Sequence, residues 1–175
     1  DFVGDSDTEV VLALYELHGI DKCMNLLDGM YAVIIYDENI NEVFMFRDIF
    51  GMKPLYYYCE GGCLIVGSEM KYLVEMARAN QSPLSTDNSA LYDFLTYGYV
   101  PTPKTNYKEI RKVHPYEFIS FSVFEGLLQK TKYQDLADYV SSEETFVEIS
   151  EVLECLRHSV SSHVNADVPV GILLS

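Results

Sequence analysis

Few side chains in this sequence combine the type and position that chemistry needs. Asp7 lies on the first turn of an expected helix, within the string Ser6-Asp7-Thr8-Glu9. A carboxylate there compensates the positive end of the helix dipole, which contributes ~0.3–1 kcal/mol. The same exposed helix end could instead hold an ammonium group through a charge-assisted hydrogen bond. The residue types leave both roles open, although acidic first turns with a purely structural role are common.

A second unusual string is Arg47-Asp48-x-x-Gly51-x-Lys53-Pro54. Adjacent opposite charges enter a loop that contains glycine, and a proline then begins an aromatic segment. This pattern indicates a fixed turn with internal ion pairs. By itself it specifies no reaction.

The cysteines and histidines do not form a ligand set. Cys59 and Cys63 stand four residues apart around a Gly-Gly pair, but no partner pair accompanies them. We interpret them as the two sides of a hairpin turn, with thiols kept reduced. His158 and His163 are five residues apart and so do not share a helix face. His114 precedes a proline in a loop, and we assign none of these histidines a catalytic role.

The last residues predict a buried strand, because Val168–Leu174 is a short apolar run after an amphipathic helix. In open α/β sheets, ligands bind at the carboxyl ends of strands, often where backbone N–H groups hold phosphate. We therefore expect a nucleotide loop to begin at Ser175. Such a strand needs neighbours on both sides, and Asp1 is not a methionine. We expect the sequence to be a fragment of a longer protein.

Charge and composition exclude several classes of protein. The 175 residues carry 12 Lys and Arg against 27 Asp and Glu, a net charge of −15. This balance argues against a sequence-independent nucleic-acid binder and against docking on an anionic membrane surface. No apolar run approaches the ~20 residues of a membrane span. We expect an acidic protein of the cytoplasm, without nucleic-acid or membrane partners.

The elements that must position these side chains fall into two groups. The first group is antiparallel β with helices, and the second opens an α/β unit, with a boundary near residues 130–142. Helices are predicted from a Ser6 cap to Gly19, over Asp21–Leu27, after a Ser68 cap, over Ser89–Tyr97, and over Phe146–Val160 after a second capping box, Ser141–Glu144. Strands are predicted over Tyr31–Tyr36, Glu42–Phe46, Pro54–Tyr58, Leu64–Val66, Glu117–Phe124 and Leu127–Tyr133, with Val100–Pro103 extended.

Six ordered strings carry a resemblance to a known family. Gly4-Asp5-Ser6-Asp7-Thr8-Glu9 is similar to the signature of class II glutamine amidotransferases. With the later strings, nearly the whole chain resembles the glutamine-hydrolysing asparagine synthetases. Those strings are Asp28-Gly29-Met30-Tyr31-Ala32, Arg47-Asp48-x-x-Gly51-x-Lys53-Pro54-Leu55-Tyr56-Tyr57, Gly67-Ser68-Glu69-Met70-Lys71, Leu95-Thr96-Tyr97-Gly98-Tyr99-Val100-Pro101 and Asp167-Val168-Pro169-Val170-Gly171-x-Leu173-Leu174-Ser175.

The resemblance implies an α+β fold, an incomplete antiparallel α/β/β/α sandwich of the N-terminal nucleophile hydrolase type. Residues 1–135 would be the C-terminal part of the glutaminase domain. Residues 136–175 would begin an α/β ATP-pyrophosphatase domain. The implied reaction uses an amino-terminal cysteine to release ammonia from glutamine. ATP with Mg²⁺ then activates aspartate, and ammonia gives asparagine, AMP and pyrophosphate. The full-length protein would be a homodimer acting on glutamine, aspartate and ATP.

Residue by residue, the resemblance assigns three positions. Asp7 would bind the α-amino group of glutamine, Leu173 would contact the adenosine part of ATP, and Ser175 would begin the pyrophosphate loop. The nucleophilic cysteine lies outside this chain, so we expect the polypeptide alone to be inactive. A paralogue with another acceptor, such as a β-lactam synthetase, and a non-catalytic scaffold remain alternatives. Tyr116 stands where the family has glycine, and must either avoid a positive φ or tolerate strain.

Overall fold

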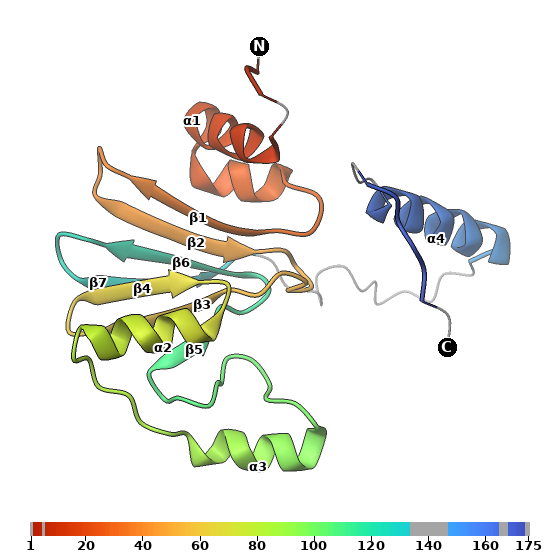
Figure 1. Cartoon of the computed structure of the whole chain (residues 1–175). Coiled ribbons are helices and arrows are strands. Elements are labelled where there is room, and N and C mark those ends of the chain that lie inside the picture. Colours follow the sequence, from red (N-terminus) through yellow and green to blue (C-terminus); the bar gives the residue numbers. More distant parts are fainter. Residues whose placement is uncertain (1, 5, 134–146, 165–167, 174–175) are drawn as a thin grey trace. The chain divides into compact units, whose positions relative to one another are not determined.

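Short apolar segments in the first part of the chain form two antiparallel sheets. The computed structural model describes residues 2–4, 6–133, 147–164 and 168–173. The chain divides into a unit of residues 1–138 and a unit of residues 139–175. Both sheets belong to the first unit (Figure 1).

The larger sheet has four strands in the order β1-β2-β6-β7, and every pairing is antiparallel. Its strands are β1 (Ala32–Asp37), β2 (Glu42–Arg47), β6 (Glu117–Ser122) and β7 (Leu127–Lys132). Met45 pairs with Ile34 on one side and with Ile119 on the other, so these side chains share one face.

The smaller sheet has three strands in the order β4-β3-β5, again antiparallel. They are β3 (Tyr56–Glu60), β4 (Cys63–Gly67) and β5 (Ile110–Lys112). β3 and β4 form the predicted hairpin, and both Gly61 and Gly62 in its turn have positive φ. β5 was not predicted, because three residues are too few to show a period of two.

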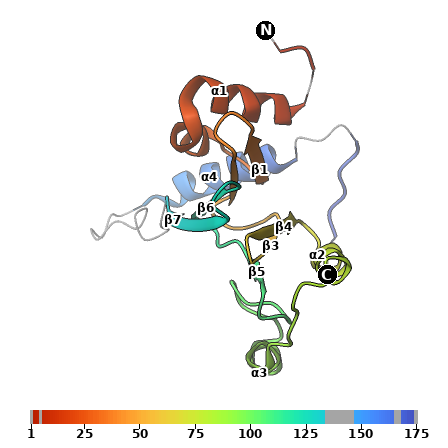
Figure 2. The ribbon, with the colours of Figure 1, turned by 90° about the vertical axis from the view of Figure 1, so that its left-hand side faces the viewer.

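The main core lies between the two sheets. Met45 and Ile119 of the larger sheet pack in one buried cluster with Tyr57 of the smaller sheet and with Leu55 and Val113. The pleat of the strands places these residues on the two facing surfaces, and further apolar residues, among them Phe46 and Tyr58, are buried on the outer faces. This cluster joins the sheets into a sandwich (Figure 2).

A helix covers the outer face of each sheet. The helix α2 (Met70–Ala79) buries Leu73 and Ala77 against Tyr58 and Ile65 of the smaller sheet. The helix α1 (Asp7–Leu26) covers the larger sheet, where the Tyr15 and Phe44 rings lie 5.8 Å apart. The predicted α/β/β/α layer order is therefore confirmed (Figure 1).

The predicted break within the first helix is also confirmed. Gly19 has φ 74° and ψ 175°, so α1 consists of two helical segments that meet at this residue. The Ser6 hydroxyl caps the first segment by accepting the Thr8 N–H at 3.3 Å. Ser6 and Glu9 have the spacing of a capping box, in which Glu9 would accept the Ser6 N–H. The Glu9 carboxylate accepts the N–H groups of Val3 and Gly4 instead.

The remaining helix of this unit, α3 (Asn88–Tyr97), ends at Gly98 as predicted, with Gly98 at φ 78°. The predicted Ser68 cap of α2 is wrong, because Glu69 is the N-cap residue. The prediction that Val100–Pro103 is extended is only partly correct. The chain turns within this segment, and the Lys104 N–H bonds the Pro101 carbonyl at 3.0 Å.

In the second unit, the helix α4 (Ile149–His163) overlaps the predicted amphipathic segment Phe146–Val160 and extends three residues beyond it. The terminal strand is wrong for the described residues 168–173, which are exposed and have no regular structure. A strand needs a neighbour to bond its N–H and C=O groups, and the described part of this unit contains no other strand. The second capping box, Ser141–Glu144, lies outside the described residues.

No helix in the described ranges has the length and apolar character needed to cross a membrane.

The two hairpin turns at one end of the sandwich touch through glycine. Gly126 has φ 64°, and a Cβ added to it would lie 2.9 Å from the Cα of Gly62. Gly61 has a similar φ of 57°, but a Cβ there would meet no atom within 4 Å. We expect Gly61→Ala to cost ~1 kcal/mol of unfolding free energy for the positive φ alone. Gly126→Ala should cost ~2 kcal/mol or more, because the backbone must also move. Urea denaturation measures both, and equal losses would contradict the glycine contact.

Tyr15 makes the unfolding free energy depend on alkaline pH. Its hydroxyl donates to Asp37 Oδ2 at 2.6 Å, and burial with this bond raises the pKa of Tyr15 to about 12. The fold therefore favours protonated Tyr15. The contribution of Tyr15 to the free energy of unfolding is complete below its ordinary pKa near 10, and it is lost as the pH rises toward 12. We expect Tyr15→Phe to cost ~1 kcal/mol at pH 8, and less at pH 11.5. Urea denaturation at pH 8 and pH 11.5 measures the cost of Tyr15→Phe, with Tyr36→Phe as a control at an exposed tyrosine. A cost for Tyr15→Phe that does not change with pH would contradict it.

Candidate functional site

The site predicted at the first helix is an exposed carboxylate on a fixed platform. Asp7 is the first residue of α1, directly after its Ser6 cap, and its side chain is exposed. Within the described ranges, no hydrogen bond or ion pair joins the Asp7 carboxylate to another residue. The carboxylate is therefore available to a ligand.

Glu9 braces the chain that leads into this helix. Its two carboxylate oxygens accept the N–H groups of Val3 and Gly4, both at 2.8 Å. These two hydrogen bonds lower the pKa of Glu9, so they are made by the charged form. The entering segment is thus tied to the first turn beside Asp7. Tyr15, bonded to Asp37, ties the same helix to the larger sheet.

The Arg47–Pro54 string forms a fixed turn, as predicted. The buried Asp48 carboxylate accepts the N–H groups of Phe50 at 3.2 Å, Met52 at 2.9 Å and Lys53 at 3.3 Å. A carboxylate with several backbone donors orders a loop much as an N-cap orders a helix start. This loop follows β2 and returns the chain to β3.

The predicted ion pairs inside this turn are wrong. The Arg47 guanidinium donates to the carbonyls of Gly51 and Val113 instead of to a carboxylate. None of the ion pairs in the described part of the chain falls in this loop. The Asp48 carboxylate and the two terminal nitrogens of Arg47 bond to backbone groups, whereas the buried Arg47 Nε has no hydrogen-bond partner among the described residues. Adjacent opposite charges in a sequence do not reveal such backbone partners. A side chain at Gly51 would collide with the Arg47 guanidinium, so glycine is required there.

The cysteine pair does not converge on one point. Cys59 packs with the core between the sheets, whereas Cys63 packs with the cluster beneath α2. Cys63 pairs with Glu60 and faces the same side of the sheet as that residue. Cys59 precedes Glu60 in β3 and therefore faces the opposite side. Their interpretation as the two sides of a hairpin is confirmed, and both thiols are free.

Tyr116 takes the second of the two expected alternatives. Its φ is 57°, the left-handed region where glycine is favoured. The ammonium of Lys132 lies 5.3 Å from the centre of its ring, and the His114 ring lies 6.1 Å away. The Tyr116 carbonyl also accepts the Tyr133 N–H at 3.1 Å. The ring contacts and this backbone bond stabilise Tyr116 in the conformation that glycine adopts more easily.

The residues predicted to contact ATP are not assembled into a site here. Leu173 is fully exposed, in a segment without regular structure. Ser175 lies outside the described residues. Their roles stay predictions.

Sequence reasoning also missed a cavity of about 630 Å³ beside α3 and the smaller sheet. Lys112, which lines it, belongs to β5, the strand that no sequence pattern indicated.

Comparison with known proteins gives a consistent family. A putative glutamine-hydrolysing asparagine synthetase 2 of Methanocaldococcus jannaschii is 32% identical over 170 residues, covering 97% of this chain and 33% of that protein. Glutamine-hydrolysing asparagine synthetase 1 of Bacillus subtilis is 33% identical over 174 residues, covering 99% and 27%. Amidase chry2 of Gibberella zeae is 31% identical over 183 residues, covering 99% and 25%. The chain thus spans about a quarter to a third of the length of these relatives.

A solved structure of Bacillus subtilis glutamine phosphoribosylpyrophosphate amidotransferase is similar, with a TM-score of 0.49 and 21% identity over 77% of this chain and 24% of that one. Residues 1–134 match the family described as the glutamine amidotransferase domain. This match spans most of the chain, and the chain therefore belongs to the glutamine amidotransferase domain family.

Proposed function

We propose that this chain is part of a glutamine-dependent asparagine synthetase. The observation that carries the proposal is the extent of the similarity. The amidotransferase match ends at residue 134, but the similarity to two proteins named asparagine synthetase covers 97% and 99% of the chain. It therefore extends into residues 136–175, which we assign to the start of the ATP-using domain.

The proposed reaction joins two half-reactions. Glutamine and water give glutamate and ammonia at the amidotransferase domain. Aspartate and ATP give an aspartyl adenylate and pyrophosphate at the second domain. Ammonia then attacks the activated carboxyl carbon and AMP leaves, which yields asparagine. Mg²⁺ would balance the phosphate charge. The described residues contain no group of three side chains able to hold a metal ion, so we assign no Mg²⁺ ligand to them.

Asp7 is our candidate for recognition of glutamine. An ammonium group is the natural partner of an exposed carboxylate that has no other described contact. Its position on the first turn of α1 supports this role, because the helix start and the Glu9 brace fix its backbone. We assign it to the α-amino group of glutamine.

Two residues of the second unit are candidates for ATP. We propose that Leu173 contacts the adenosine and that Ser175 is the first residue of a pyrophosphate loop. The complete exposure of Leu173 is compatible with a contact to a ligand. The net charge of −15 and the free thiols favour a cytoplasmic protein with small-molecule partners. We also propose a homodimer of the full-length protein.

A second candidate is a related enzyme with a different acceptor. Its support is the similarity to amidase chry2, which covers 99% of this chain at 31% identity. The two candidates share glutamine use and differ in which carboxylate is amidated. Assay of the full-length protein with aspartate distinguishes them.

Substitution of Asp7 tests the proposal in the full-length protein. We expect Asp7→Ala to reduce glutamine-dependent asparagine synthesis at least ~10-fold, because a charge-assisted hydrogen bond to the substrate ammonium is lost. Synthesis from free ammonia should be unchanged, because it bypasses glutamine. The control Glu16→Ala removes another exposed carboxylate of α1 and should change neither rate. Equal loss of both activities in Asp7→Ala would contradict the assigned role.

A further inference from the structure

A cavity of about 630 Å³ lies between α3 and the smaller sheet, the sheet that α1 does not cover. This volume is within the range of ~300–1,000 Å³ that is usual for small-molecule sites. Most of its lining is apolar or aromatic. The walls include Tyr56, Leu91, Phe94, Tyr99 and Val100.

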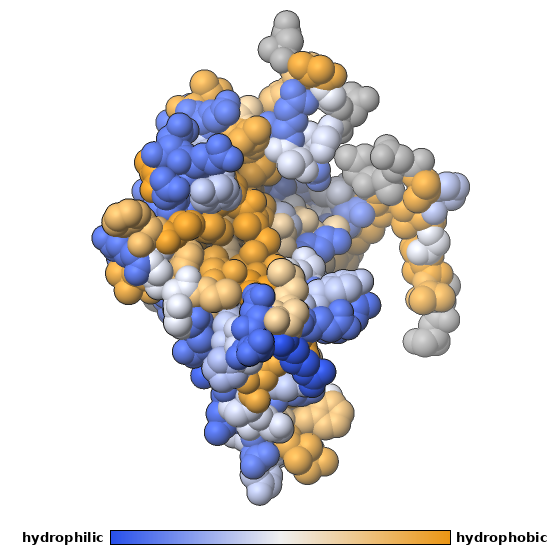
Figure 3. All heavy atoms as spheres, turned by 60° about the vertical axis from the view of Figure 1, so that its left-hand side comes forward, coloured by the Kyte–Doolittle hydropathy of each residue, from blue (hydrophilic) through white to orange (hydrophobic). Residues whose placement is uncertain are grey.

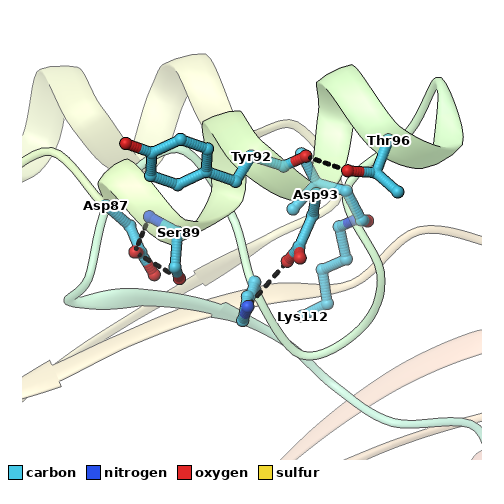
Figure 4. Close-up of polar contacts among 8 residues, drawn as sticks. Asp87, Ser89, Tyr92, Asp93, Thr96 and Lys112 are labelled. Atoms are coloured by element: carbon cyan, nitrogen blue, oxygen red, sulfur yellow. Dashed lines mark hydrogen bonds and ion pairs between the residues drawn. The ribbon is translucent and has the colours of Figure 1, made fainter.

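Polar contacts at the start and in the middle of α3 fix this helix beside the cavity. At its start, the Asp87 N–H bonds the Asn106 carbonyl at 2.9 Å, and the Asp87 carboxylate accepts the Ser89 N–H at 2.9 Å. Further along, Asp93 pairs with Lys104 at 2.6 Å (Figure 4). α3 is thus held beside the sheet by its polar groups, and the apolar space between them is part of the fold.

Lys112 brings an unbalanced positive charge to this apolar space. Its side chain extends from β5 toward α3 (Figure 4). Its ammonium donates to the Val100 carbonyl at 2.5 Å. In the part of the chain that the structure describes, no carboxylate forms an ion pair with it. Burial, with the nearby Arg47, lowers the pKa of Lys112. Its charged form is therefore poorly compensated.

No nearby carboxylate in the described ranges pairs with Lys112. Asp93, outside the lining, forms an ion pair with Lys104 instead. Asp87, which also lines the cavity, uses its Oδ1 on the N–H and hydroxyl of Ser89 at the helix start. A carbonyl carries only a partial charge, so the bond to Val100 does not balance the positive charge of the Lys112 ammonium. The carboxylate of a ligand would balance that charge.

We propose that this cavity binds a small monocarboxylate with an aromatic or branched aliphatic body. The carboxylate pairs with Lys112 Nζ, and the body lies along Leu91 and Phe94. Both walls are reached from solvent, because Leu91 is 56% and Phe94 52% exposed. Apolar residues also reach the surface at the end of the unit where α3 lies, at the bottom of Figure 3. This site is separate from Asp7 and does not rest on the proposed function.

Three matched probes test the site in the intact protein. They are 4-phenylbutyrate, 4-phenylbutan-1-ol and 4-phenylbutylamine, which share a body and differ in the charge of the head group. Isothermal titration calorimetry at pH 7 should show the carboxylate binding about 5-fold or more tightly than the alcohol, the value of ~1 kcal/mol for a partly exposed ion pair. The amine should bind more weakly than the alcohol. Equal affinities of carboxylate and alcohol, or no saturable binding, would overturn the proposal.

Variants then locate the binding. Lys112→Met should reduce the affinity for the carboxylate to that for the alcohol, whereas Lys108→Met, an exposed lysine outside the cavity, should change neither. Ala90→Leu fills the cavity from its buried wall and should weaken all three probes. A carboxylate preference that survives Lys112→Met would overturn the assignment. If Lys112→Met does not fold, the probe comparison on the unaltered protein and on Ala90→Leu still decides the question.

Discussion

The buried Asp48 carboxylate is the constraint on which the sandwich depends. It accepts three backbone N–H groups of the loop between β2 and β3, and its own N–H bonds the Tyr31 carbonyl at 3.0 Å. Arg47 beside it bonds the Val113 carbonyl, just after β5 of the other sheet, at 3.2 Å. One pair of adjacent charged residues therefore closes the loop and connects the sheets. Because buried polar groups are costly without partners, replacement of Asp48 by an apolar residue would leave the N–H groups of this loop without their acceptor.

The sandwich built on this turn has two outer surfaces with different roles. On the larger sheet, α1 presents Asp7 at a braced helix start, where an ammonium group can bind. Beside the smaller sheet, α3 stands away from the strands and leaves a cavity whose charge is set by Lys112. We propose that the first surface binds glutamine and that the second binds a small monocarboxylate.

Local patterns in the sequence predicted much of the fold. Two apolar segments around a polar turn predicted the β1–β2 hairpin, the glycine at residue 19 marked the break in α1, and Gly98 marked the end of α3. The failures have common physical causes. β5 is too short for a periodic signal, and the partners of Arg47 and Asp48 are backbone groups, which carry no mark in the sequence. The Lys112 cavity depends on tertiary packing alone. Asp7 was found only because its neighbours match a family signature.

We propose that the full-length protein passes the amide nitrogen of glutamine to aspartate with cleavage of ATP to AMP and pyrophosphate. The most direct measurement supplies the full-length protein with glutamine labelled with ¹⁵N in the side-chain amide, together with aspartate and ATP. Mass spectrometry should then detect the label in the side chain of asparagine, with one AMP and one pyrophosphate formed for each asparagine. Label found only in free ammonia, or in an amide of another acceptor while aspartate is unchanged, would contradict the account.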